Sequence, residues 1–541
     1  MKRKSFFNDI KNKIEKQNEL IVGFILFLVF FVLFFVDYDV TEAKGDIAEY
    51  VNNPLRIING DYPYRDFWLL FPPGEVYFPY LIYKIFGLKI NYVFISSLVI
   101  SALIPVVGFF IGKLLCKSNS SGILTSVLIF FNGLPVMYVG PIYNYIYFLL
   151  IILSFYFFAN YLNNKKFSNV FLSALFISSS LFFRLYETFA ALASLFIIIL
   201  FMLFEKQISK KIFLENFFIF LTFLFMIFLF YFIFFAKILN FMIKEVLIES
   251  VGHISSERKL YFDASFRHFN FYLKYIQDLK IFQAFFHFFG FLRSTILYLL
   301  PFIMFFVIVS SLRKIKSPYE KFIVLMFFLW GFFTLPKAVL GGDMSHLGSS
   351  TTQLLIPLVF FTKNLDKKMK RLLIVIIIIV LLSIPSFFLK KFLNLTAVHY
   401  KISTDYGYIL LNDKNVAESV NKTIKFILNF TDKNDYIFVT SYDSPPIYVL
   451  TNRKNPTYYD SLVDVTSRPT LEKQNKICSD LITKNTKLII YSDFYLDDIK
   501  NVSFSQKCKI LEKCIKENFH LIEKYGNIEI YISNETKYLL N

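Results

Sequence analysis

The feature that most constrains this chain is a series of long apolar runs, of the kind that cross a lipid bilayer as helices. A membrane-spanning helix needs roughly 17–25 mainly apolar residues. Eleven such runs occur, near 20–36, 90–112, 122–139, 143–162, 167–185, 188–204, 213–236, 293–312, 321–340, 350–362 and 372–389. Only 18% of the residues are charged, compared with about 25% in soluble proteins. The sequence therefore predicts an α-helical polytopic membrane protein with about 11 transmembrane helices, and it excludes an ordinary cytosolic enzyme, a coiled coil or a disordered chain.

The basic residues between the runs predict how the chain is oriented. The net charge is +18, and cytoplasmic loops of membrane proteins are enriched in Lys and Arg. Basic residues precede the first run, so 1–19 is predicted to be a cytoplasmic N-terminus and the run itself an anchor. Alternation then places further basic loops inside, near 113–117, 165–166, 206–211, 313–321 and 363–371. This distribution predicts a multi-pass protein of the plasma membrane, without a nucleic-acid partner.

The same alternation leaves three larger segments outside the membrane, at 37–89, 237–292 and 390–541. The transmembrane domain is predicted over 20–389. In the last segment, short apolar runs alternate with helix-length polar stretches, which predicts an extracytoplasmic α/β domain. The expected strands are Tyr436–Thr440, Lys487–Tyr491 and Ile528–Ile532, and the expected helices are Val416–Leu428 and Glu472–Thr483.

Three of the four cysteines lie in this tail, and they match no metal-ligand spacing. In an oxidising compartment, one disulfide could form, either between Cys508 and Cys514 or from Cys478 to either of them. The sequence does not choose between these pairings.

The first outer segment combines an unusual number of acidic residues with apolar ones. Its carboxylates are Asp37, Asp39, Glu42, Asp46, Glu49, Asp61, Asp66 and Glu75. Residues 46–58 fit a helix along the membrane surface, Gly60 and Pro63 break it, and Tyr77–Phe86 fits a second interfacial helix. The carboxylates are either the solvated face of a loop or candidates for acid–base chemistry.

An ordered set of motifs in this segment resembles a known family. The set is Asp46, then Gly60-Asp61-Tyr62-Pro63-Tyr64-Arg65-Asp66-Phe67, then Pro72-Pro73-Gly74 and Phe86-Gly87. It is similar to the first periplasmic or lumenal loop of GT-C glycosyltransferases, in particular the group related to aminoarabinose transferase and protein O-mannosyltransferase. The family often has Asp-Glu at the acidic position, whereas this chain has Asp46-Ile47, with Glu49 two residues later.

The resemblance implies a GT-C-like transmembrane domain and an inverting glycosyltransferase. Such an enzyme moves a sugar from a polyprenyl phosphate to an acceptor hydroxyl on the outer face of the membrane, and a carboxylate near that hydroxyl acts as general base. The catalytic candidates are Asp46, with Glu49 and Asp66 as alternates. The departing lipid phosphate needs cations or hydrogen-bond donors. The substrate-binding candidates are Tyr64, Arg65, Tyr143, Asn144, Arg184, Asp343, His346, Arg258 and Lys259.

Several of these residues also have purely structural interpretations. An arginine at a helix end, as Arg184 is, more often anchors that end at the lipid headgroups. His346 fits a hydrogen-bonding role in a short turn, and Asp343 or Ser349 fits a helix cap. The basic and aromatic segment 237–292 is either part of the donor site or an amphipathic loop on anionic lipid.

The predicted partners are a polyprenyl-phosphate-linked sugar, membrane lipid, and a glycan, lipid or protein acceptor. Some relatives of this fold use a divalent metal, but the sequence contains no ligand cluster specific enough to assign a metal cofactor. Two other functions remain open, an O-antigen-type polymerase or ligase and a lipid-linked oligosaccharide transporter. A transporter would carry ionisable residues inside its spans, and a ligase would carry Arg and His in a late loop. The acidic first loop favours the glycosyltransferase.

Overall fold

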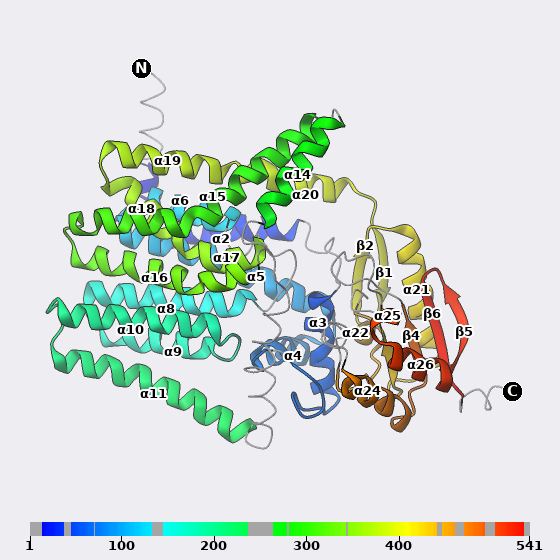
Figure 1. The fold of residues 1–541 in the computed structure, drawn as a ribbon. Coiled ribbons are helices and arrows are strands. Elements are labelled where there is room, and N and C mark those ends of the chain that lie inside the picture. The colour runs from blue at the N-terminus through cyan, green and yellow to red at the C-terminus, as the bar shows by residue number, and fades with distance from the viewer. Residues whose placement is uncertain are drawn as a thin grey trace.

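The molecule consists of a long helical bundle and a smaller α/β domain at one end of it (Figure 1). The computed structural model describes residues 13–36, 45–69, 71–132, 144–235, 263–278, 281–341, 344–440, 446–459, 470–492 and 504–534.

A helix lies over each of the eleven predicted apolar runs. The bundle helices are α2 (Glu19–Phe35), α5 (Ile90–Cys116), α6 (Asn119–Asn132), α8 (Asn144–Asn164), α9 (Phe167–Ser180), α10 (Tyr186–Phe204), α11 (Lys210–Phe235), α15 (Ile281–Ser311), α16 (Pro318–Gly341), α17 (Met344–Thr351), α18 (Leu355–Asn364), α19 (Lys367–Leu381) and α20 (Ser383–Thr396). Short 3₁₀ turns lie at Leu312–Lys314 and Thr352–Leu354. Within the described residues, six helices are long and apolar enough to cross a membrane.

Packing in the bundle follows the rules of helices in lipid. The helices α5 and α6 approach closely at Gly122, where a Cβ atom would lie 2.6 Å from the carbonyl oxygen of Phe109. Small residues permit such close contacts between membrane helices. By contrast, α11 exposes Phe218, Phe225 and Phe232 on its outer face, as expected of a surface in contact with lipid. The structure is that of an integral membrane protein.

The end of the bundle far from the α/β domain gathers the basic loops. Pairs there join residues from different loops: Lys113 to Glu19, Lys321 to Glu205, and Lys314 to Asp366 at 3.7 Å. The side chain of Glu15 accepts hydrogen bonds from Ser118 and from the backbone N–H of Asn119, at 2.7 and 2.8 Å. The loops that the alternation of charge assigns to one side of the membrane are therefore together in space.

The α/β domain contains a β-hairpin and a four-stranded sheet. The hairpin joins β1 (Tyr400–Thr404) to β2 (Gly407–Leu411). The sheet has the order β3-β4-β6-β5, with β3 (Ile437–Val439) parallel to β4 (Leu488–Tyr491), and with β6 (Ile528–Ser533) antiparallel to β4 and to β5 (Phe519–Tyr525). Its helices are α21 (Lys414–Phe430), α22 (Ile447–Thr451), α24 (Leu471–Thr483), α25 (Phe504–Lys507) and α26 (Lys509–Asn518).

The predicted elements of this domain are confirmed where the sequence signals are strong. Expected strands coincide with β3, β4 and β6, and expected helices with α21 and α24. Both helices begin at a side-chain cap, because Asp413 accepts from the N–H of Val416 and Thr470 from that of Lys473. A disulfide joins Cys478 on α24 to the cysteine at position 514 on α26, which is one of the pairings the sequence allowed.

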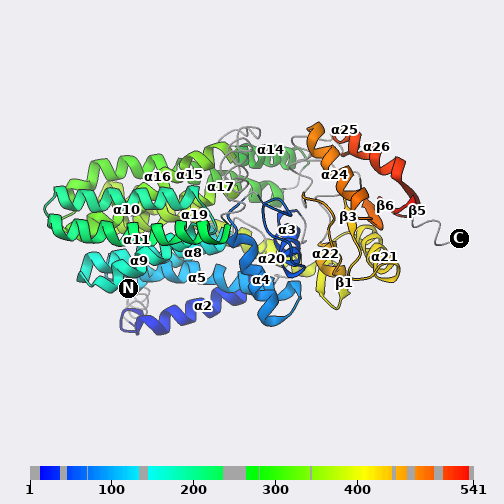
Figure 2. The ribbon, with the colours of Figure 1, turned by 90° about the horizontal axis from the view of Figure 1, so that it is seen from below.

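In its described residues, the segment 37–89, which the sequence predicts to lie outside the membrane, forms two helices, α3 (Asp46–Ile58) and α4 (Gly74–Phe86), as the sequence predicts. They lie where the bundle meets the α/β domain (Figures 1 and 2). Val51 of α3, Val93 of α5 and Ile409 of β2 belong to one buried apolar cluster. The α/β domain is therefore packed onto the bundle through this segment. In the second outer segment, α14 (Asp263–Gln277) packs along the start of α15.

Candidate active site

Helix α3 is hydrogen-bonded both to α4 and to the α/β domain. The helix begins at Asp46. The carbonyl oxygen of Val51 accepts a hydrogen bond from the hydroxyl of Tyr83 on α4, at 3.0 Å. The side-chain oxygen of Asn52 accepts from the N–H of Val449 in the α/β domain, at 3.1 Å. These bonds fix the start of the acidic segment relative to both parts of the molecule.

The loop after α3 turns back at Tyr64, which has a φ of 64° and is fully buried. Its hydroxyl donates to the carbonyl oxygen of Phe71 at 2.6 Å, so this tyrosine closes the loop. Burial, with further negative charge nearby, raises its pKa well above the usual value. In the structure, Tyr64 supports the loop.

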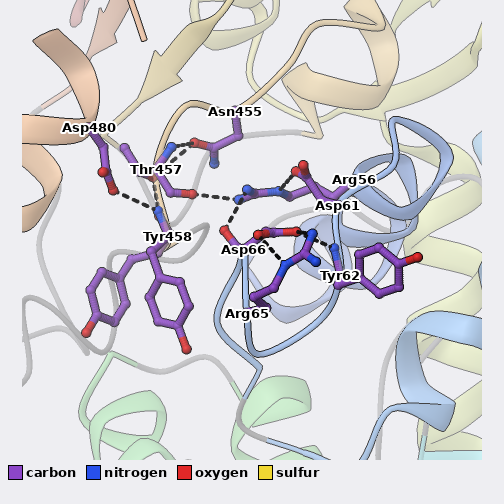
Figure 3. Close-up of polar contacts among 10 residues, drawn as sticks. Arg56, Asp61, Tyr62, Arg65, Asp66, Asn455, Thr457, Tyr458 and Asp480 are labelled. Atoms are coloured by element: carbon purple, nitrogen blue, oxygen red, sulfur yellow. Dashed lines mark hydrogen bonds and ion pairs between the residues drawn. The ribbon is translucent and has the colours of Figure 1, made fainter. Parts of the chain in front are cut away.

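Arg65 and Asp66 form a tight pair at the tip of the loop (Figure 3). The guanidinium donates from Nε and Nη2 to the two carboxylate oxygens, at 2.8 and 2.5 Å, and lies 4.4 Å from the ring centroid of Tyr62. The N–H of Tyr62 also donates to Asp66, at 2.8 Å. Partial burial opposes ionisation of Asp66, but these hydrogen bonds and the positive charge outweigh it and lower its pKa. The paired carboxylate also raises the pKa of Arg65.

Arg56, at the end of α3, joins the loop to the α/β domain. Its guanidinium donates to the carboxylate of Asp61 at 2.8 Å, to the carbonyl oxygen of Asp66 at 3.0 Å and to that of Thr457 at 2.6 Å (Figure 3). It also lies 5.0 Å from the ring centroid of Phe67. The side chain is only 5% exposed, so three polar partners and a ring replace its water. The sequence did not single out this residue.

Next to the loop, three buried charged residues and the partly buried Lys337 form two ion pairs at the ends of helices. Nε of Arg184 lies 3.4 Å from the carboxylate of Glu75 at the start of α4, and its guanidinium carbon lies 3.4 Å from the ring centroid of Phe71. Glu187 in the first turn of α10 pairs with Lys337 of α16. Because unpaired charges are very costly in a low-dielectric interior, each member requires its partner. These pairs connect the first loop to the rim formed by α9, α10 and α16.

The other predicted site residues are described less fully. Glu49 is half-buried in the first turn of α3. For Asp46, Asn144 and His346 the structure describes the backbone alone, at or near the starts of α3, α8 and α17. α3 and α17 both lie at the bundle end next to the α/β domain (Figure 1). Four predicted residues fall outside the described residues: Tyr143, Asp343, Arg258 and Lys259.

No group of three or more His, Cys, Asp or Glu side chains that could hold a metal ion occurs in the described part of the chain. The carboxylates near the loop are instead bonded to cations, as Asp61 is to Arg56 and Asp66 to Arg65.

The fold of this chain, a helical bundle joined to a C-terminal α/β domain, is similar to that of two solved membrane-protein structures. The apo structure of ArnT from Cupriavidus metallidurans matches with a TM-score of 0.57 and 10% identity, over 95% of this chain and 98% of that chain. The Archaeoglobus fulgidus oligosaccharyltransferase, solved with zinc and sulfate, matches with a TM-score of 0.52 and 12% identity, over 95% of this chain and 73% of that chain. No protein-family model and no curated protein matches the chain. The likeness is one of fold, and it confirms the predicted fold class.

Proposed function

We propose that this protein is a membrane glycosyltransferase. In this proposal it moves a sugar from a polyprenyl-phosphate donor to an acceptor hydroxyl at the outer face, with inversion at the anomeric carbon. The observation that carries the proposal is the position of the acid-bearing helix α3, at the junction of bundle and α/β domain, in a fold shared with two solved glycosyltransferases. The identity of the sugar does not enter this argument.

The inverting reaction needs a carboxylate that takes the proton of the attacking hydroxyl. Of the three candidates, Asp66 is the least suited, because two hydrogen bonds from Arg65 and one from the N–H of Tyr62 occupy it. The same contacts lower its pKa, and a carboxylate with a lowered pKa is a weaker base. We therefore propose Asp46 as the base, with Glu49 as the alternate, both in the first turn of α3.

The leaving group is a lipid phosphate, which positive charge stabilises as the glycosidic bond breaks. Arg184 and Lys337 are each paired with a buried carboxylate, so their charges are already compensated within the protein. Arg184 also holds the turn before α4, since it stacks on Phe71 and pairs with Glu75. We propose that its part in substrate binding is to position this turn. We propose that His346, Arg258 and Lys259 contact the phosphate directly.

The proposal is tested by mass spectrometry of surface glycans and lipid-linked sugars from cells with and without the gene. Loss of the enzyme should remove one sugar from a surface glycan and cause the matching polyprenyl-phosphate sugar to accumulate. Asp46→Asn should have the same effect, because removing a general base slows transfer by about 10²- to 10⁴-fold. The control is Asp405→Asn in the exposed turn between β1 and β2.

Two results would contradict the proposal. One is an unchanged set of glycans and lipid-linked sugars without the gene. The other is normal transfer by both Asp46→Asn and Glu49→Gln, which would remove the proposed base from the first turn of α3.

A further inference from the structure

A polar cavity of about 400 Å³ lies between the loop after α3 and helix α24 of the α/β domain. Its volume falls within the range of small-molecule sites, about 300–1,000 Å³. The lining residues are Asn59, Gly60, Asp61, Arg65, Asp66, Tyr458, Lys476, Asp480 and Lys484. Every lining side chain carries a polar group, so the cavity does not suit a lipid tail or another apolar ligand.

The two sides of this cavity are joined by hydrogen bonds and are not a loose gap. The hydroxyl of Tyr458 donates to the carbonyl oxygen of Tyr64 at 3.1 Å, and the N–H of Trp68 donates to the carbonyl oxygen of Tyr458 at 2.8 Å. The N–H of Tyr458 donates to the carboxylate of Asp480 at 3.3 Å (Figure 3). The walls are thus held in place before any ligand arrives.

Three carboxylates and three cations line the cavity, and a further cation, Arg56, pairs with one of the carboxylates from outside the lining. Asp61 is paired with Arg56, Asp66 is paired with Arg65, and Asp480 is paired with Lys476 at 2.5 Å. Each carboxylate of the lining therefore has a cation of its own.

Lys484, at the C-cap of α24, is a further cation. Among the described residues no carboxylate forms an ion pair with it, and its ammonium lies 5.6 Å from the ring centroid of Tyr436. Partial burial, and then the positive charge of Arg56, lower the pKa of Lys484, while the carboxylates of Asp480 and Asp61 oppose the shift without forming an ion pair with it. An anionic group in the cavity would pair with the ammonium of Lys484.

The distance between this cavity and the proposed base sets the size of the ligand. Asp46 begins α3, and the cavity lies just past the other end of the helix, which is at residue 58. At 1.5 Å per residue, the two ends are about 18 Å apart. A ligand that reaches from the cavity to Asp46 must therefore be extended. An oligosaccharide is long enough, whereas a single sugar is too short.

We propose that this cavity binds an acidic sugar of an extended glycan acceptor, with Lys484 as the counter-ion of its anionic group. This inference deepens the proposed function and rests on it, because the bound glycan is an acceptor only if the protein is a glycosyltransferase. The paired cations Arg65 and Lys476, together with the hydroxyl-bearing Tyr458, provide hydrogen-bonding groups for the sugar ring. The anionic group is a carboxylate or a phosphate on the sugar, and both would meet the same ammonium.

The test measures binding to the purified full-length protein in lipid nanodiscs, by isothermal titration. The probes are trigalacturonate and the uncharged trisaccharide maltotriose. Trigalacturonate should bind, and Lys484→Ala should weaken it by about tenfold or more, because a charge-assisted hydrogen bond is lost. Lys484→Arg should retain most of the affinity. The matched control is Lys422→Ala, which removes an exposed charge from α21 on another part of the domain.

Competition separates the two anionic groups. Displacement of trigalacturonate by glucuronate indicates a carboxylate, and displacement by glucose 6-phosphate indicates a phosphate. Equal binding of maltotriose, equal displacement by glucose, or a Lys484→Ala protein that is folded by circular dichroism and binds normally would overturn the inference.

Binding is measured without transfer, so the two proposals fail separately. If Asp46→Asn abolishes transfer while neither trigalacturonate nor glucose 6-phosphate binds, the role of the cavity is wrong and the enzyme assignment stands. If trigalacturonate binds through Lys484 while no glycan depends on the gene, the glycosyltransferase assignment is wrong and the anion site stands.

Discussion

Replacing Arg56 with alanine should loosen the contact between the first loop and the α/β domain. The side chain is 5% exposed and donates to Asp61, to the carbonyl oxygen of Asp66 and to that of Thr457. A hydrogen bond from a charged group contributes about 1.5–3 kcal/mol. Asp61 is 35% exposed and can bind water once Arg56 is gone. The total loss of free energy is therefore well below the sum for three hydrogen bonds. We expect the docking free energy to fall by about 3 kcal/mol.

Hydrogen exchange with mass spectrometry measures this change in the full-length protein. A loss of about 3 kcal/mol should make exchange roughly 100-fold faster in residues 59–69 and 455–459, at 1.4 kcal/mol for each factor of ten. Arg65→Ala is the matched control, because this neighbouring arginine is 53% exposed and, among the described residues, bonds only within its own loop. It should change exchange little. Equal exchange in the two variants would refute the role assigned to Arg56.

Three further predictions follow from the ion pairs and the disulfide. The pKa of Asp66 is lowered in the folded protein. Its ionised carboxylate therefore stabilises the folded loop at pH values above the unfolded-state pKa of about 3.9, and this stabilisation is lost as the pH falls from there through the lower pKa of the folded state. Proteolysis of the loop should therefore quicken in acid, and Asp66→Asn should remove that pH dependence. Glu187→Gln should lower the free energy of unfolding by about 3 kcal/mol, because it leaves the partly buried ammonium of Lys337 without its partner. The double variant with Lys337→Met should recover part of this loss in thermal unfolding. Non-reducing peptide mapping should recover a peptide in which Cys478 is joined to Cys514. Replacing this disulfide by Cys514→Ser should lower the free energy of unfolding by about 2–4 kcal/mol.

The helices of the bundle were predictable because a bilayer leaves the backbone few alternatives. Unpaired N–H and C=O groups are too costly in lipid, so a long apolar run must be helical. The strands that the sequence missed are β1, β2 and β5. Two of these form a separate hairpin, and β5 is at the edge of its sheet. β1 and β5 carry charged residues, for example Lys401, Glu523 and Lys524, so these two strands lack the apolar run that marks a central strand.

The sequence predicted which segment forms the candidate site, but it did not predict the contacts that this segment makes. The carboxylates and breaks of the first loop indicated α3, α4 and the turn between them, because these signals are local. The partner of Arg56 is Thr457, 401 residues further along the chain, and nothing local to either residue indicates the pairing. For the same reason the sequence drew attention to Arg184 without its partner Glu75, and did not single out Lys337. Long-range ion pairs are set by the fold.

The measurement that tests the central claim most directly is the labelling of single cysteines in intact cells. The chain would have Cys116 and Cys508 replaced by alanine, with Asp46→Cys, His346→Cys or Lys165→Cys added one at a time. Because α3 and α17 lie at the same end of the bundle and 165 lies in a basic loop at the other, an impermeant maleimide should label positions 46 and 346 from outside. Position 165 should react only after the membrane is permeabilised. Labelling of 46 and 346 from opposite sides of the membrane would contradict the account.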